Sequence, residues 1–281
     1  GFENILADVP REALATVNQF IVYAEDGAPH APGLLGKPAL AWADLAEADE
    51  LAESHAAPDA PCVIFTTSGT TRLPKFVLHS QESIASHSAD ITRAFEMNRP
   101  GTAVLLTIPL CGTFGLSHAL AGLAGDSHYR DAARVRAGQA APADARGLKL
   151  VGVYGSSELQ AMLSRQSSDA APEQRELGGG RLVSQEGRVR AAHPETGALL
   201  PHGESGELQF CVPSRMIGYY GNPEATAASL TEDGYFRSGD LGYTIDDTTY
   251  VFQSRMGDAL RLGGFLVNPL EIEAVIDAHP A

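Results

Sequence analysis

Short apolar runs and longer segments of helical periodicity alternate along the first half of the chain. The runs with the length and composition of strands are residues 20–23 (FIVY), 63–65 (VIF), 103–108 (AVLLTI) and 148–153 (LKLVGV). Helices are predicted at residues 43–56, 77–97 and 114–123. Ser80 is placed to cap the second helix. Strands that alternate with helices predict an α/β sheet.

From Gly178 the pattern changes to short strands separated by turn residues. The expected strands are RLVS, GRVRAAH, GELQFCV and TTYVF. These predict a β-rich subdomain over residues 178–255, after an α/β part at residues 1–177. Residues 256–281 are expected to form a hinge and the start of a further domain. A helix is predicted to begin there near Pro269, because Asn268 can cap it.

The stretch Val63–Val77 joins an expected strand to a hydroxyl-rich loop and a lysine. Residues Thr66–Thr71 are small or hydroxyl-bearing, so their backbone can approach an anion closely, and Lys75 supplies a positive charge. A nucleotide triphosphate is the expected ligand, although an ordinary surface turn has a similar composition. Pro74 precedes the lysine and Phe76 follows it, which is not the common P-loop pattern. Ordinary kinase or GTPase chemistry is therefore not expected.

Two further stretches carry carboxylates. In YGSSE, Tyr154 can stack on a flat ring, Ser157 can donate to a phosphate or carboxylate oxygen, and Glu158 can hold a hard cation. This cluster follows an expected strand, where open α/β sheets bind ligands, but it also fits a helix cap. Asp240 lies in a predicted Gly-Asp turn, whose carboxylate can accept both hydroxyls of a ribose. Most Gly-Asp pairs are simple turns.

Composition narrows the class of protein. The 281 residues are 44% hydrophobic and 20% charged, which is typical of a soluble globular protein of one large or two medium domains. The net charge of −15 argues against nonspecific binding to nucleic acids or acidic membranes. Cys62, Cys111 and Cys211 lack metal or redox spacing, so buried free thiols in a cytoplasmic protein are expected. No membrane span, secretion signal or zinc-ligand spacing is evident.

Four separated stretches together resemble the adenylate-forming superfamily of acyl-CoA synthetases, peptide-synthetase adenylation domains and luciferases. They are, in chain order, FTTSGTTRLPKFV, YGSSE, YFRSGDLG and SRMGDALRLGGFLVNPLEIE. These are similar to the family's phosphate loop, Tyr-Gly-x-Thr-Glu motif, Gly-Asp motif and hinge with its Gly-Gly loop. The resemblance implies a large N-terminal domain of α/β subdomains and a barrel-like β-rich subdomain, followed by the stub of a small C-terminal domain.

The resemblance implies an ATP-dependent acid–thiol ligase. The carboxylate of an aryl or fatty acid would attack the α-phosphate of ATP with loss of pyrophosphate, and coenzyme A would then capture the acyl group. Mg²⁺ and hydrogen-bond donors would neutralise the charge that accumulates on phosphorus. Delivery to a carrier-protein thiol is one alternative. Another is a degenerate nucleotide-binding or scaffolding protein.

The resemblance also implies roles for individual residues. The phosphates would be held by Thr67, Ser68, Gly69, Thr70, Thr71 and Lys75. Tyr154 would lie against adenine, Asp240 would bind the ribose hydroxyls, and Arg255 would lie beside ribose and phosphate. Ser157 would contact the α-phosphate or acyl carboxylate, Glu158 would bind Mg²⁺, and Phe114, Gly155 and Ser156 would lie near the acyl group. Gly257 and Asp258 would form the hinge, and Gly263 and Gly264 the loop of the coenzyme A step.

Several positions depart from the family pattern. Arg72 and Phe76 stand where glycine is usual, which predicts a stiffer loop with an extra charge near the phosphates. Gly112 replaces a common histidine, and Gly257 replaces an Asp or Lys at the hinge. The chain is also short for the family, in which a lysine of the C-terminal domain serves adenylation. We therefore expect a truncated or incompletely ordered version, with segments missing around residues 125–147.

Overall fold

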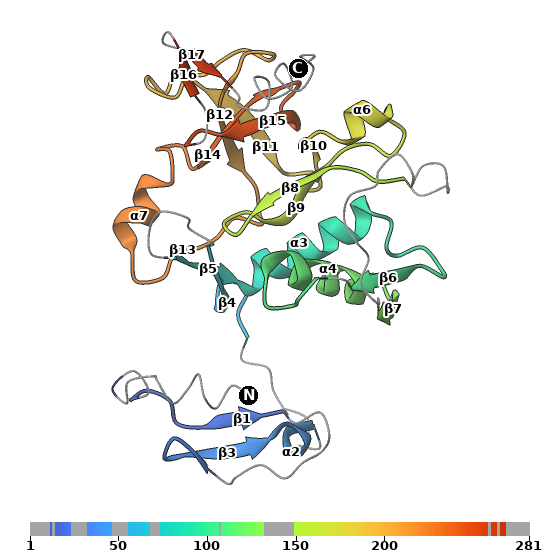
Figure 1. The fold of residues 1–281 in the computed structure, drawn as a ribbon, viewed down its shortest axis with the longest axis vertical. Helices are drawn as coiled ribbons and strands as arrows, with labels where there is room; N and C mark the ends of the chain where they lie inside the picture. Colours follow the sequence, from blue (N-terminus) through green and yellow to red (C-terminus); the bar gives the residue numbers. More distant parts are fainter. Residues whose placement is uncertain are drawn as a thin grey trace, which may run out of the picture. The chain divides into compact units, whose positions relative to one another are not determined.

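The computed structural model describes residues 12, 15–23, 33–46, 56–67, 74–106, 108–131, 149–257, 260–262 and 265–267. The chain divides into two compact units, Gly1–His55 and Ala56–Ala281. In the first unit, β1 (Phe20–Val22) runs parallel to β3 (Lys37–Ala41), which also pairs with β2 (Gly33–Leu34) and leads into α2 (Trp42–Ala46) (Figure 1). The strand predicted at residues 20–23 is confirmed. The helix predicted at residues 43–56 is confirmed only at its start, because residues 47–55 lie outside the described residues.

The predicted phosphate loop connects the two strands of a hairpin. β4 (Pro61–Thr66) pairs antiparallel with β5 (Phe76–Ser80), and β13 (Gly218–Tyr219) pairs with the other edge of β5. The prediction that residues 77–80 begin a helix was wrong. Exposed and buried side chains alternate along β5, and its backbone groups bond to β4 instead of to a helical turn. The unit is therefore strand, loop, strand and helix.

Two helices follow this hairpin. α3 (Gln81–Ala94) begins as predicted at Ser80, whose hydroxyl accepts from the Ser83 N–H at 3.1 Å. α4 (Thr113–Ala124) joins β6 (Ala103–Leu106) to a parallel strand, β7 (His128–Asp131). This βαβ unit confirms the predicted α/β pattern, but β7 was not predicted. Of the β6 side chains only Val104 is buried, so the prediction of a fully buried strand was wrong.

The second half of the chain forms a seven-stranded antiparallel sheet in the order β11-β12-β14-β15-β10-β9-β8. The strands are β8 (Val153–Ser156), β9 (Gln160–Arg165), β10 (Gly179–Leu182), β11 (Arg188–Ala192), β12 (Gly206–Cys211), β14 (Phe236–Thr244) and β15 (Thr249–Arg255). Four of them match the predicted strands. The strand predicted at residues 148–153 instead begins at Val153, and the β-rich part begins there too instead of at residue 178, because β8 and β9 pair into this sheet.

Short elements complete the described chain. They are α6 (Pro172–Arg175), α7 (Pro223–Ala228), β16 (Leu260–Leu262) and β17 (Phe265–Val267), the last two forming a hairpin. The helix predicted near Pro269 lies outside the described residues. No helix among the described residues is both long and apolar enough to cross a membrane.

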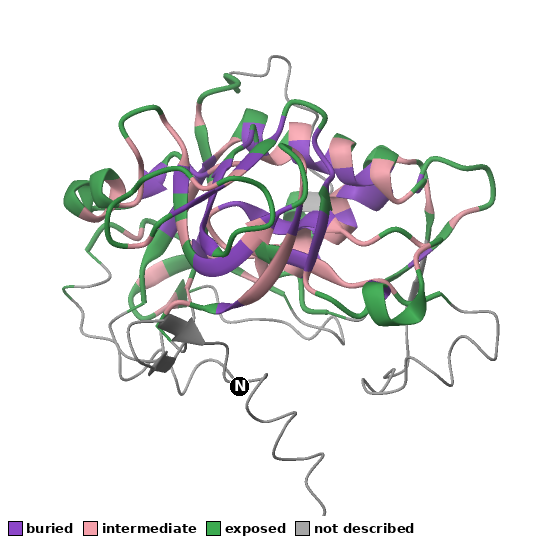
Figure 2. Ribbon diagram, turned by 90° about the horizontal axis from the view of Figure 1, so that it is seen from above, coloured by how far each residue is buried: buried purple, intermediate pink, exposed green. Residues whose placement is uncertain are grey.

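Strand β9 separates two hydrophobic clusters. Leu163 packs into the larger one with Phe210, while its neighbour Met162 packs with Ile91 of α3 and Ala121 of α4. Alternate residues of a strand point to opposite faces, so one strand can serve both clusters. Figure 2 shows buried segments on strands as well as on helices.

The three cysteines are free, as predicted, but exposed instead of buried. Cys62 illustrates the reason, since it lies on β4, where exposed residues are frequent along the strand. Apolar neighbours in sequence therefore did not place these thiols in the core.

Candidate nucleotide site

The base of the predicted phosphate loop is closed by two reciprocal contacts. The Lys75 N–H donates to the Thr67 hydroxyl at 3.0 Å, and the Thr67 N–H donates to the Lys75 carbonyl at 3.0 Å. Thr67 therefore lies at the base of the loop, and because its hydroxyl oxygen accepts this bond, its hydroxyl proton stays available to a ligand. The predicted loop residues Ser68, Gly69, Thr70 and Thr71, together with Arg72, lie outside the described residues.

One tyrosine contacts two of the predicted site residues. The Tyr219 hydroxyl donates to Glu158 Oε1 at 2.9 Å, and the Lys75 ammonium nitrogen lies 4.4 Å from the centre of the Tyr219 ring. Burial, followed by the Glu158 carboxylate, raises the pKa of Tyr219, so the phenol stays protonated and remains a donor. The structure thus brings a cation and a carboxylate together around one aromatic ring.

The backbone that carries Glu158 is held by neighbouring elements. His79 of β5 donates from Nε2 to the Ser157 carbonyl at 2.8 Å, and the Met216 N–H donates to the Glu158 carbonyl at 2.8 Å. Burial lowers the pKa of His79, which favours the neutral ring with a single N–H. The position of Ser157 and Glu158 is therefore fixed mainly through backbone contacts.

The hairpin between β8 and β9 contains strained backbone. Gln160 and Met162 have φ angles of 67° and 59°, a region that residues other than glycine rarely adopt. Gln160 is held there by its amide nitrogen, which donates to the carbonyls of Ser83 and Ser214 at 2.8 and 3.2 Å. Strain that surrounding contacts maintain is common near functional sites.

The same hairpin explains why YGSSE contains small residues. A Cβ atom on Gly155 would stand 2.6 Å from the Gln160 carbonyl oxygen, so only glycine fits. The Ser156 hydroxyl accepts from the Leu159 N–H at 3.2 Å. YGSSE is therefore the end of β8 and a tight hairpin, and the predicted alternative of a helix cap was wrong.

Asp240 lies in an irregular part of β14, so the predicted simple turn was wrong. The register between β12 and β14 shifts at this point, and Gly239 has a φ of 69°. The Ser238 hydroxyl accepts from the Asp240 N–H at 3.0 Å and donates to the Leu208 carbonyl at 2.6 Å. Arg255 pairs with Asp240 across β14 and β15, which brings Arg255 Nε to 3.9 Å from Asp240 Oδ1.

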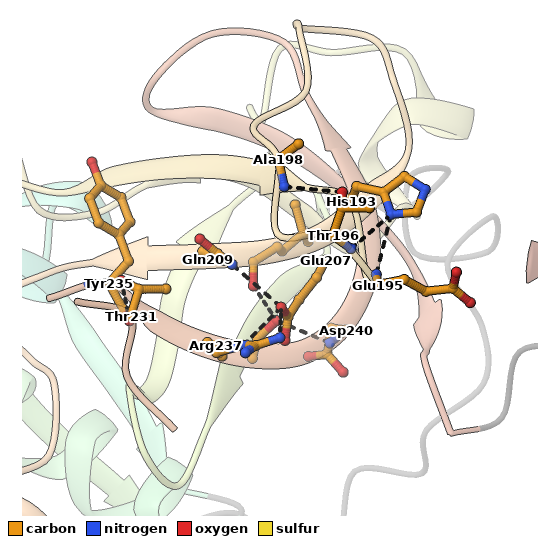
Figure 3. Close-up of polar contacts among 12 residues, drawn as sticks. His193, Glu195, Thr196, Ala198, Glu207, Gln209, Thr231, Tyr235, Arg237 and Asp240 are labelled. Carbon is orange, nitrogen blue, oxygen red and sulfur yellow. Dashed lines mark hydrogen bonds and ion pairs between the residues drawn. The ribbon is translucent and has the colours of Figure 1, made fainter. Parts of the chain in front are cut away.

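Beside Asp240, the same strands carry a network of polar side chains (Figure 3). Arg237 donates from Nε and Nη2 to Glu207 Oε2 at 3.1 and 3.0 Å, and the Gln209 amide donates to the same oxygen at 3.4 Å. Glu207 is buried, so this ion pair compensates a charge removed from water. The contacts between Arg237 and Glu207 hold β12 and the irregular segment of β14 together.

Tyr154 is buried and hydrogen-bonded to another predicted site residue. Its ring is buried and lies 5.7, 5.6 and 5.5 Å, centre to centre, from the rings of Phe210, Tyr250 and Phe252. The ring is therefore part of the aromatic core, and its contact with adenine stays a prediction. Its hydroxyl donates to Asp240 Oδ2 at 2.5 Å. Burial, followed by the charge of Asp240, raises the pKa of Tyr154 and keeps it a donor.

Two further predicted residues, Phe114 and Gly257, form no hydrogen bond or ion pair with Lys75, Glu158 or Asp240 in the part of the chain described. Phe114 packs with the α3–α4 cluster and meets His118 edge to face. Gly257 lies in a turn after β15, whose preceding residue Met256 donates to the Gly239 carbonyl at 2.9 Å. Asp258, Gly263 and Gly264 lie outside the described residues.

A groove of about 740 Å³ lies elsewhere, between α3 and the loops of the β-rich sheet. Its lining includes Glu82, Asp90 and Arg93 from α3 and Arg215 from the loop before β13. None of the predicted site residues lines it. This groove is therefore separate from the candidate nucleotide site.

The donor set at Glu158 suits a magnesium ion carried by a nucleotide. No group of three or more His, Cys, Asp or Glu side chains able to hold a metal occurs among the residues described. Magnesium in nucleotide sites is usually held by one or two carboxylates together with substrate phosphates. A single half-buried carboxylate near the Lys75 ammonium fits this arrangement.

Sequence reasoning missed Tyr219 and His79. Tyr219 lies in the stretch GYYGNPEAT, where its neighbours match the family but no charge or spacing marks it. His79 follows the loop by four residues in an apolar run. Both residues form hydrogen bonds with partners more than sixty positions away in sequence. These contacts depend on the pairing of β5 with β13 and on the β8–β9 hairpin, which the sequence alone did not predict.

Comparisons with known proteins show which enzymes this chain is similar to. The family of AMP-binding enzymes matches residues 6–128. Among curated proteins, the chain is 27% identical to 4-coumarate–CoA ligase 2 of Oryza sativa subsp. japonica, with 85% of this chain and 53% of the relative covered. It is 40% identical to probable 4-coumarate–CoA ligase 2 of Dictyostelium discoideum over 92 residues, which are 33% of this chain and 17% of that protein. The chain thus spans at most about half of these relatives.

Solved structures show the same fold. ATP-bound MatB from Rhodopseudomonas palustris superposes with a TM-score of 0.72 at 23% identity, covering 87% of this chain and 60% of that one. O-succinylbenzoate coenzyme A synthetase (MenE) from Bacillus subtilis, in complex with AMP, gives a TM-score of 0.70 at 20% identity, with the same coverage. The family match, the sequence relatives and the fold agree, and the chain is similar to the adenylate-forming enzymes, in particular to CoA ligases.

Proposed function

We propose that this chain is the nucleotide-binding part of an ATP-dependent acid–thiol ligase that forms an acyl-adenylate and then an acyl-CoA. The observation that carries the proposal is the placement of Tyr154 and Glu158 on one short hairpin. Tyr154 donates to the carboxylate of Asp240, while Glu158 accepts a hydrogen bond from the hydroxyl of Tyr219, whose ring lies under Lys75. One stretch of five residues thus connects the proposed ribose site with the proposed phosphate site.

Each end of ATP has a suitable partner. Asp240 offers carboxylate oxygens to the ribose hydroxyls, and Arg255 stands beside it with an exposed guanidinium. Lys75 offers an ammonium at the base of the hydroxyl-rich loop, where the polyphosphate would lie. A chain with a net charge of −15 needs such local cations to hold an anion.

In the first step, a substrate carboxylate oxygen forms a bond to the α-phosphorus, and the bond to the bridging oxygen of pyrophosphate breaks. In the second step, the sulfur of coenzyme A forms a bond to the acyl carbon, its proton is lost, and AMP leaves. Glu158 would hold Mg²⁺, which supplies positive charge to the phosphate oxygens. Lys75 and the side chain of Ser157 would orient the same oxygens, so that the α-phosphorus faces the acid.

The test is pyrophosphate release from ATP and Mg²⁺ with a panel of aryl and fatty acids. We expect release that depends on the acid, and formation of the corresponding acyl-CoA when coenzyme A is added. Aryl acids are the first class to test, because several curated relatives are named 4-coumarate–CoA ligases. Omission of the acid is the control for simple ATP hydrolysis.

Other outcomes would replace this proposal with a specific alternative. Acid-dependent pyrophosphate exchange without acyl-CoA would indicate delivery to a carrier-protein thiol. ATP binding without pyrophosphate release for any acid would contradict the ligase activity of this chain and indicate a nucleotide-binding protein. Gly112, where many acyl-CoA synthetases have histidine, lies at the start of α4 and would alter access to the acid in the ligase case.

A further inference from the structure

Tyr219 is the one residue of the described chain that touches both the proposed phosphate cation and the proposed magnesium carboxylate. Its hydroxyl donates to Glu158 Oε1 at 2.9 Å, and its ring supports the Lys75 ammonium at 4.4 Å. A cation over an aromatic face is attracted by the ring, and a charged acceptor strengthens the phenol hydrogen bond. The two contacts use different parts of one side chain, so the hydroxyl contact can be removed while the ring is kept.

The position of Tyr219 is set independently of these contacts. Its backbone lies in β13, where Tyr219 pairs with Val77, and its N–H donates to the Thr226 hydroxyl of α7 at 2.9 Å. The neighbouring Tyr220 N–H donates to the Phe76 carbonyl at 2.8 Å. A strand anchored on both sides holds the ring even when its hydroxyl is removed.

The Glu158 backbone is likewise fixed without Tyr219. His79 and the Met216 N–H hold the carbonyls of Ser157 and Glu158. The Tyr219 hydroxyl therefore acts on the orientation of the Glu158 carboxylate and not on the path of the chain.

We propose that Tyr219 is a positioning residue that orients Glu158 toward a nucleotide-bound divalent cation and holds Lys75 over the same phosphates. The inference rests on the proposed nucleotide function, but it concerns binding and requires no acid substrate or turnover. Groups that orient a metal ligand typically change metal affinity by about 10- to 100-fold. The effect is therefore expected in the dependence of ATP binding on Mg²⁺.

The experiment is calorimetric titration of the 281-residue chain with ATP, in EDTA and at several Mg²⁺ concentrations. For Tyr219→Phe, we expect ATP affinity in EDTA to match the unmodified chain, while the Mg²⁺ concentration for half-maximal enhancement rises about tenfold. Tyr219→Leu should also weaken binding in EDTA, because it removes the ring beneath Lys75. Tyr220→Phe is the matched control, since Tyr220 is exposed and adjacent, and it should change neither quantity.

A purely structural role predicts a different result. If Tyr219→Phe lowers the melting temperature and weakens ATP binding equally with and without Mg²⁺, the positioning role is wrong. It is also wrong if the Mg²⁺ dependence is unchanged, or if the unmodified chain does not bind ATP. By contrast, normal Mg²⁺-dependent binding without pyrophosphate release would overturn the ligase function and leave the role of Tyr219 supported.

Discussion

The two ends of the candidate nucleotide site are built differently. Around Asp240, the contacts come from paired strands, and Tyr154 fixes the carboxylate from within a cluster of aromatic rings. Around Lys75, the cation is exposed at the base of a loop and is held by the ring of Tyr219. The first end is therefore organised before a ligand arrives, because its groups are locked by packing. The second end depends on the side chain of Tyr219, which lies in the edge strand β13 of a three-stranded sheet.

This contrast predicts where substitutions act. Changes at the Asp240 end should affect nucleotide affinity and stability together, since the groups that bind also contribute to the core. Changes at the Lys75 end should affect affinity for the charged phosphates with little loss of stability. The following variants test that difference in order of decreasing effect.

Asp240→Ala should weaken ATP binding about 100-fold, because it removes two charge-assisted hydrogen bonds to the ribose worth about 1.5–3 kcal/mol each before compensation by water. Titration calorimetry measures the affinity. Asp247→Ala is the control, since Asp247 is an exposed carboxylate of the same sheet region. An Asp240→Ala chain with unchanged affinity would remove the ribose assignment.

Tyr154→Phe should lower both stability and ATP affinity, each by about 2 kcal/mol, because a buried charged acceptor loses its donor while the ring is kept. Urea unfolding and ATP titration provide the two measurements. Tyr250→Phe is the matched control, as its hydroxyl shares a hydrogen bond with Ser164 at 2.8 Å in the same aromatic cluster. It should lower stability alone, and an equal effect on affinity would show that Asp240 needs only general packing.

Lys75→Ala should weaken binding of ATP with Mg²⁺ about tenfold, with the loss shrinking at high salt because the lysine is exposed. Stability should stay within about 0.5 kcal/mol of the unmodified chain. ATP titration at two salt concentrations, together with urea unfolding, measures both. A large loss of stability would contradict the contrast between the two ends.

Acidification should lower stability modestly through His79. Its pKa is lowered by burial from the ordinary 6.5, so the folded state binds the proton less readily than the unfolded chain. The stability that the neutral His79 contributes is fully present above pH 6.5, the ordinary pKa of histidine. As pH falls from 6.5 to the lower pKa of the folded state, the free energy of unfolding decreases by about 1 kcal/mol per pH unit. His87 and His118 have pKa values lowered by the same cause and add to this decline.

Urea unfolding across this pH range should therefore show a shallower decline for His79→Gln. The substitution removes one of the three histidine rings whose pKa burial lowers, and the amide of glutamine can still donate a hydrogen bond. His128→Gln, at an exposed position, is the control and should keep the full decline. An unchanged pH slope in His79→Gln would show that this ring does not contribute.

Local sequence was sufficient for the elements whose signals are short-range. The Ser80 cap, the helix that follows it and four strands of the β-rich sheet could be predicted, because capping and apolar alternation depend on neighbouring residues. The family motifs also identified Lys75, Glu158, Asp240 and Arg255 as a candidate set. The structure joins Asp240 to Arg255 by strand register, and Lys75 to Glu158 through Tyr219.

The sequence by itself determined which chemical groups are present and the order in which they occur. Only the tertiary structure decided the direction of each side chain. Tyr154 turns into the core toward a carboxylate 86 positions away, and Tyr219 reaches a glutamate 61 positions away. The physical reason is that the register of strands distant in sequence sets both the burial of a side chain and its hydrogen-bond partners. An aromatic residue in a motif can therefore hold a carboxylate in place, as Tyr154 and Tyr219 do.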